Sequence, residues 1–124
     1  MIPEVYPPEV HEKAWGKELW IRNGKDYCGK ILIINPGSRF SYHFHLLKRE
    51  TFYIAQGSLE LIWIDTDKAW PNNKTVNQGD VIHLEPGVPH QLWNKSNEEA
   101  RIFEVSTQHF ESDSYRVIPG DSQK

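Results

Sequence analysis

Short apolar runs separated by turn-forming residues constrain the fold of this 124-residue chain more than any other feature. No segment keeps an apolar period of 3.6 residues over three turns, as an amphipathic helix would. The runs are rich in β-branched and aromatic residues, which favour strands. We expect strands over residues 15–21, 27–34, 41–45, 51–55, 58–64, 81–84, 88–93 and 100–107. The pattern predicts an all-β domain of roughly eight to ten strands, closed as a sandwich or barrel.

The turn signals give the expected connections. Asn23-Gly24 is typical of a two-residue hairpin turn. Residues 65–73, which include Pro71, are predicted to form the one longer loop. Residues 1–13 contain several prolines, and we expect an extended N-terminal arm that lies along the surface or on a partner subunit.

Charge and composition exclude several classes of protein. The formal net charge is -3, with no basic stripe, which argues against nucleic acid as a partner. The longest apolar run, Ile31–Ile34, is far too short to cross a membrane. Residues 1–8 lack the charged and apolar regions of a signal peptide. Cys28 has no cysteine to pair with, which fits a cytoplasmic location, and we expect it to be a small buried side chain.

Four possible metal ligands come from two stretches of the chain. His43 and His45 are one residue apart, so in a strand they point to the same side. Glu50 follows closely, and His90 comes from a second segment. Imidazole nitrogens with one carboxylate oxygen suit zinc, iron, manganese, nickel or copper. Without a cation, such a cluster would leave polar atoms short of partners. The sequence therefore predicts one divalent metal ion on these four residues.

The spacing of these residues resembles the two signature motifs of the cupin superfamily. The first motif, at residues 37–57, and the second, at residues 79–94, match at Gly37, His43, His45, Glu50, Gly57, Gly79, Gly87, His90 and Asn94. The chain departs from the second motif only at Glu85, where the family has proline, and Pro86 follows one place later. The resemblance implies that residues 1–124 form a single cupin domain, a double-stranded β-helix or jelly-roll barrel.

A closer resemblance covers nearly the whole chain. Trp15-Gly16, the segment at residues 41–45 and the ending at residues 103–116 are similar to the cupin part of type II mannose-6-phosphate isomerases. That family usually has glutamine at the place of His43. The resemblance implies a metal-dependent isomerase that interconverts a phosphorylated aldose and ketose through an enediolate.

This resemblance gives candidate catalytic residues beside the metal. Lys48 and Glu104 are candidates for the base that moves a proton between adjacent carbons. If the Glu104 side chain faces the barrel interior, it is a candidate base or a partner that orients a histidine ligand, and if it faces outward it is only solvated. Arg116, with Lys48 as a second candidate, would hold the phosphate, since a guanidinium binds it through two parallel hydrogen bonds. We expect His83 and His109 to be ordinary strand or loop histidines.

Two other functions are compatible with the same residues. Three histidines and one glutamate also suit an iron- or copper-dependent dioxygenase, and His43 in place of glutamine favours this alternative. A non-catalytic cupin that binds a sugar or nucleotide-sugar is the third hypothesis.

The pocket lining and the partners can also be predicted. Phe52 and Ile54 share the face of Glu50 by alternation and should form the wall of the pocket. We expect a small-molecule substrate and a homodimer formed by strand exchange or sheet-on-sheet contact.

Overall fold

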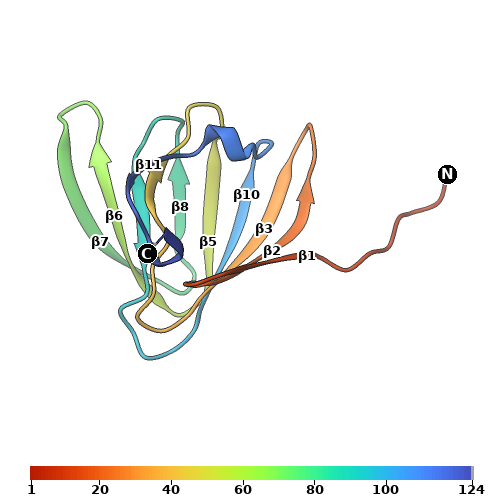
Figure 1. Cartoon of the computed structure of the whole chain (residues 1–124), viewed down its shortest axis with the longest axis horizontal. Helices are drawn as coiled ribbons and strands as arrows, with labels where there is room; N and C mark the ends of the chain where they lie inside the picture. Colours follow the sequence, from red (N-terminus) through yellow and green to blue (C-terminus); the bar gives the residue numbers. More distant parts are fainter. Residues whose placement is uncertain (124) are drawn as a thin grey trace.

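Two antiparallel sheets make up the protein in the computed structural model, which describes residues 1–123 (Figure 1). One sheet has six strands in the order β1 (Glu9–Lys13), β2 (Gly16–Asn23), β3 (Cys28–Ile34), β10 (Ala100–Ser106), β5 (Glu50–Gln56) and β8 (Val81–Leu84). The other has five, in the order β11 (Tyr115–Ile118), β4 (Tyr42–Phe44), β9 (His90–Trp93), β6 (Ser58–Asp65) and β7 (Trp70–Asn77). The expected all-β jelly roll is confirmed.

The helical content of the described chain is limited to two single turns of 3-10 helix, η1 (Glu111–Asp113) and η2 (Asp121–Gln123). Neither is long or apolar enough to serve as a membrane span, and residues 1–123 contain no helix that is.

The hydrophobic core fills the space between the two inner faces. It takes alternate residues from the strands, because successive side chains of a strand point to opposite faces. Phe52 and Ile54 of β5 are both buried with Glu50, as the alternation predicts. The core comprises Trp15, Leu32, Ile34, Phe40, Phe52, Ile54, Leu59, Leu61, Val76, Ile82, Leu84, Leu92, Ala100 and Ile102. It leaves one end of the barrel to polar side chains, where the metal-ligand candidates lie.

The turn after β2 differs from the sequence prediction. Residues 24–27 connect β2 to β3, and the Gly24 N–H donates to the Tyr27 carbonyl at 3.0 Å. The two-residue turn expected at Asn23-Gly24 is therefore wrong. That turn needs positive φ at both central residues, and neither Asn23 nor Gly24 has it.

The predicted loop at residues 65–73 is also wrong in its second half. Trp70 begins β7, which pairs with β6 from Asp65↔Trp70 to Ser58↔Asn77. Seven of the eight residues of β7 are not buried, so the strand lacks the apolar alternation by which strands are predicted. Pro71 is tolerated because β7 is the edge of its sheet.

The expected N-terminal arm is shorter than residues 1–13. Glu9–Lys13 form β1, an edge strand paired with β2, and only the residues before it extend away from the barrel (Figure 1). β1 is short, polar and charged, as edge strands often are, so its sequence does not resemble a buried strand. β11 was not expected either, and all four of its residues are exposed.

Candidate metal centre

Strand pairing brings the histidines of the two motifs together. His43 lies in β4 and is directly paired with His90, the first residue of β9. His45 follows β4 and points to the same side as His43, as the one-residue spacing predicts. One potential ligand atom from each of the three histidines lies within 4.8 Å of the others. The structure therefore positions three imidazoles, from segments more than 40 residues apart, to bind one metal ion.

Backbone carbonyls fix which nitrogen of each ring faces the centre. The Nδ1 atom of His43 lies 2.8 Å from the Ser41 carbonyl. That of His45 lies 2.7 Å from the Asp113 carbonyl, and that of His90 lies 2.9 Å from the Val88 carbonyl. A carbonyl oxygen only accepts, so each Nδ1 carries the hydrogen and each neutral ring presents the lone pair of Nε2. This arrangement is typical of metal-binding histidines.

Glu50, at the start of β5, lies against two of these nitrogens. Its Oε1 is 2.9 Å from Nε2 of His90 and 3.6 Å from Nε2 of His45. Both Glu50 Oε1 and His90 Nε2 are buried and have no hydrogen-bond partner. Two lone-pair atoms this close repel each other unless a proton or a metal cation lies between them. The residues present therefore fit a divalent metal ion.

Burial keeps His43 and His45 in the neutral form that metal binding requires. Burial, reinforced by His90 and His45, lowers the pKa of His43 well below its ordinary value. Burial and the charge of Lys48 lower the pKa of His45.

A pocket of about 680 Å³, including its open mouth, lies beside these residues. Glu104 and Lys48 are both buried in its wall, so Glu104 does face the barrel interior. The Nζ of Lys48 lies 3.3 Å from Glu104 Oε2 and 3.1 Å from Glu50 Oε2. Burial alone lowers the pKa of Lys48, but the carboxylates of Glu104 and Glu50 outweigh it and raise the pKa above its ordinary value. Burial and the Glu50 carboxylate raise the pKa of Glu104.

Arg116 lies at a different part of the pocket. It belongs to β11, is paired with His43 and is exposed. Within residues 1–123, no hydrogen bond or ion pair engages its guanidinium. Lys13 of β1 also lines the pocket. The structure thus separates the two predicted phosphate ligands, because Lys48 is buried and paired with carboxylates while Arg116 is open to solvent.

The two histidines outside the motifs have different surroundings. His83 is exposed on β8, beside Thr51 and Glu85. His109 lines the pocket, and its Nδ1 lies 3.2 Å from Nζ of Lys48. Lysine only donates, so this Nδ1 accepts and the remaining hydrogen of the neutral ring is on Nε2. His109 is therefore part of the pocket, which its position outside both motifs did not indicate.

Asp113 supports the centre and was not predicted from the sequence. Its carboxylate accepts hydrogen bonds from the backbone N–H groups of Leu46, Leu47 and Lys48 at 2.8–3.2 Å. Its carbonyl accepts the bond from His45. Asp113 is buried. The only signal in the sequence was that this acidic residue lies between two serines, within the ending at residues 103–116 that resembles the isomerase family.

Comparison with known proteins agrees with this architecture. Among solved structures, the capsular polysaccharide assembling protein CapF from Staphylococcus aureus is 18% identical, with a TM-score of 0.81 over 92% of this chain and 33% of that one. Oxalate decarboxylase from Bacillus subtilis is 18% identical, with a TM-score of 0.79 over 89% of this chain and 30% of that one. At this identity the likeness shows the fold alone, and the chain spans about a third of the length of these proteins.

No curated protein matches the sequence. The family model of the cupin domain matches residues 30–106, which include all three clustered histidines. That match covers more than half of the chain, and it coincides with the two-sheet barrel described above. The chain belongs to the cupin family.

Proposed function

We propose that this protein is a metal-dependent isomerase that interconverts a phosphorylated aldose and ketose. One divalent ion, of zinc, iron, manganese or nickel, is held by His43, His45, His90 and Glu50. The observation that carries the proposal is the facing pair of buried lone-pair atoms, Glu50 Oε1 and His90 Nε2, 2.9 Å apart beside a polar pocket. When bound there, the ion supplies Lewis-acid chemistry that lowers the cost of an enediolate.

The wall of the pocket provides groups for proton transfer. Glu104 is buried with a raised pKa, and a raised pKa favours proton exchange by a carboxyl group. In the proposed reaction Glu104 takes the proton from one carbon and returns it to the next. Lys48 is held protonated by two carboxylates, which suits it to orient Glu104 and the substrate better than to act as the base.

The mouth of the pocket carries cationic side chains that can bind the phosphate. Arg116 offers an exposed guanidinium without an ion pair within residues 1–123, and Lys13 adds a second cation to the lining. In this proposal Arg116 binds the phosphate while the sugar carbons extend toward the centre. The name of one structural neighbour, a capsular polysaccharide assembling protein, adds support for a carbohydrate ligand.

The test is an isomerase assay on aldose phosphates with the metal-loaded protein, after its metal content as purified has been measured by mass spectrometry. We expect turnover in the wild type, loss of turnover in His45→Ala and a raised KM in Arg116→Gln. The unphosphorylated sugars serve as control substrates and should react poorly.

Other outcomes would redirect the assignment. Oxygen uptake by the iron-loaded protein, without isomerisation, would support the dioxygenase alternative. Sugar-phosphate binding by calorimetry without turnover would support a non-catalytic binding protein. Turnover unchanged in His45→Ala would contradict the proposal.

A further inference from the structure

The two oxygens of the Glu50 carboxylate have different partners. Oε1 faces the nitrogens of His90 and His45, at 2.9 and 3.6 Å. Oε2 faces Nζ of Lys48 at 3.1 Å. Glu50 is 2% exposed, so solvent does not compete for either oxygen.

Lys48 is itself held in place from three sides. Its Nζ lies 3.3 Å from Glu104 Oε2 and 3.2 Å from Nδ1 of His109, in addition to Glu50. These three contacts match the three hydrogens of an ammonium group. Lys48 is 4% exposed, and its backbone N–H is held by Asp113. The ammonium group therefore has a single available position.

We infer that Lys48 is a positioning residue that restricts Glu50 to one-oxygen coordination of the metal ion. This inference rests on the metal site of the proposed function. With Oε2 engaged by a buried ammonium group, only Oε1 is free to bind the ion. A carboxylate that binds through one oxygen occupies one coordination position, which keeps a further position open for the substrate.

Lys30 provides a matched control for this role. It is also a buried lysine of the pocket wall, 2% exposed, with a carboxylate partner in Glu18 at 3.5 Å. It forms no ion pair with Glu50 within the described residues. Lys30→Met thus removes a buried ammonium group from the same pocket without releasing Oε2 of Glu50.

The experiment is the visible absorption spectrum of the full chain loaded with Co²⁺, whose d–d bands weaken as the number of ligand atoms rises. The variants are Lys48→Met, Lys48→Arg and Lys30→Met. We expect Lys48→Met to lose band intensity, because the freed Oε2 joins Oε1 on the ion. Lys48→Arg keeps a cation at Oε2 and should retain the wild-type spectrum, as should Lys30→Met. Thermal unfolding of each variant checks that it is folded.

A wild-type spectrum in folded Lys48→Met would overturn the inference, and so would equal losses of intensity in Lys48→Met and Lys30→Met. A wild type that binds no Co²⁺ would overturn both the inference and the metal site. Failure of the isomerase proposal alone is distinguishable, because the spectra would change as expected while the aldose phosphates remain unconverted.

Discussion

His109 shows how a single residue acquires its properties from the residues that surround it. Burial, together with the positive charges of Lys48 and Lys30, lowers the pKa of His109 to about 4. The ordinary value of 6.5 applies in the unfolded chain. Between these two values the unfolded chain binds a proton that the folded protein excludes, so stability falls as pH falls from about 6.5 to about 4.

We therefore predict that the metal-free protein loses free energy of unfolding over this pH range, and that His109→Gln reduces the loss. His43 and His45, whose pKa values are also lowered, contribute in the same direction, so the variant should flatten the dependence without abolishing it. Glu104 acts in the opposite direction, since its pKa is raised. The measurement is denaturant unfolding in chelator at a series of pH values. The exposed His83 gives the control variant His83→Gln, and an identical slope in wild type and His109→Gln would refute the account.

At the scale of elements, the C-terminal segment locks the loop between β4 and β5. Asp113 in η1 binds three consecutive backbone N–H groups of this loop and orients His45 through its carbonyl. The loop also carries Lys48. The positions of His45 and Lys48 therefore depend on contacts with Asp113, which is more than 60 residues away in the sequence.

We predict that Asp113→Ala destabilises the protein by about 2–4 kcal/mol, because buried N–H groups lose a charged acceptor. The metal affinity should fall as well, since the loop and His45 become free to move. Thermal unfolding and metal titration measure the two effects. Glu111→Ala changes another acidic residue of η1 whose side chain is 77% exposed, and it should leave both unchanged. Equal behaviour of the two variants would show that Asp113 has no such role.

The start of β2 depends on a glycine for a different reason. Gly16 has a φ of 147°, and a Cβ built there would lie 1.8 Å from the Ile33 carbonyl oxygen. An alanine would therefore combine backbone strain with a clash against the neighbouring strand.

We predict that Gly16→Ala lowers the free energy of unfolding by at least about 3 kcal/mol, because strain and overpacking add. Gly79 has a φ of 94° but no atom within 4 Å of its built Cβ, so Gly79→Ala should cost only the strain, about 1–2 kcal/mol. Denaturant unfolding compares the two. If Gly79→Ala lowered the free energy of unfolding more than Gly16→Ala, the predicted clash between β2 and β3 at Gly16 would be refuted.

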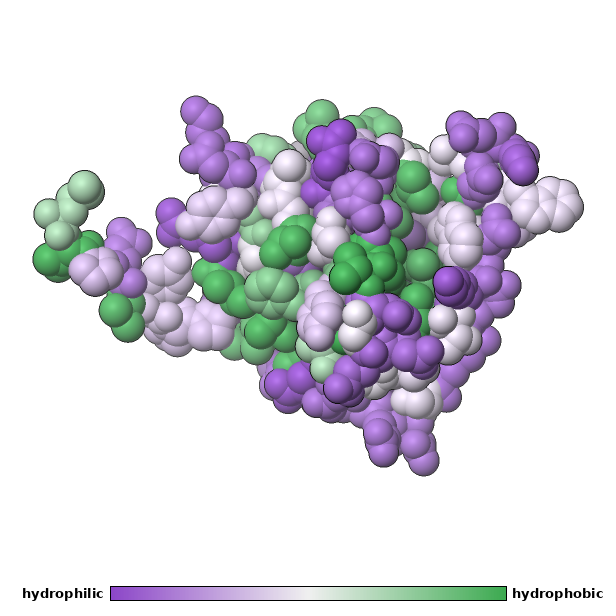
Figure 2. Space-filling model, turned by 180° about the vertical axis from the view of Figure 1, so that it is seen from behind, coloured by the Kyte–Doolittle hydropathy of each residue, from purple (hydrophilic) through white to green (hydrophobic). Residues whose placement is uncertain are grey.

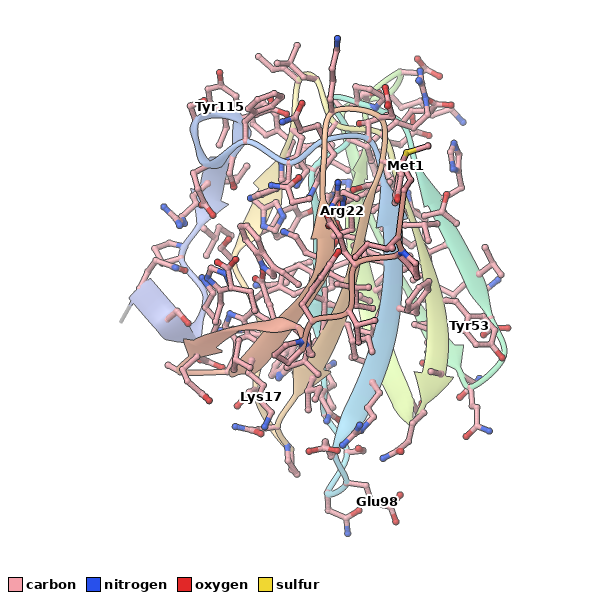
Figure 3. The ribbon with its side chains drawn as sticks, turned by 90° about the vertical axis from the view of Figure 1, so that its right-hand side faces the viewer. Met1, Lys17, Arg22, Tyr53, Glu98 and Tyr115 are labelled. Carbon is pink, nitrogen blue, oxygen red and sulfur yellow. The ribbon has the colours of Figure 1, made fainter. Side chains whose placement is uncertain are left out.

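At the scale of the whole molecule, one apolar row crosses the outer face of the six-stranded sheet. Strand register places its members side by side, one from each strand: Val10, Leu19, Ile31, Phe103, Tyr53 and Val81. Figure 3 shows Tyr53 pointing away from the barrel on the side opposite Tyr115 of β11. Figure 2 shows hydrophobic side chains gathered on the back of the molecule, next to the projecting N-terminal residues.

The homodimer expected from the sequence stays a prediction, and this row offers a face for it. We predict that the wild type has the mass of a dimer by light scattering and that Phe103→Glu shifts it to monomer. Phe103 lies mid-row and is 37% exposed, so a charge there would be buried without a partner in a sheet-on-sheet dimer. Trp70→Glu, on the exposed edge strand β7, is the control and should not change the mass. A wild-type monomer at high protein concentration would count against the dimer.

The sequence predicted the strands that alternate and missed those that do not. β5, with Glu50, Phe52 and Ile54 buried, follows the period-two rule and was predicted to within a residue at each end. β7 and β11 are largely exposed, and their stability comes from backbone pairing with β6 and β4, which leaves no hydrophobic pattern. Apolar alternation in a sequence reflects the burial of side chains, and edge strands bury few of theirs.

The sequence by itself determined the chemistry of the centre: two histidines on one side of a strand, a third histidine in a second motif, and the glycine turns that separate the strands. Only the tertiary structure decided which ring nitrogen of His45 faces the centre, that His109 lies against Lys48, and that Asp113 holds the loop. Alternation and turns act over a few neighbouring residues and can be read along the chain. Hydrogen bonds between segments 60 or more residues apart form only when the sheets close, so no local pattern encodes them.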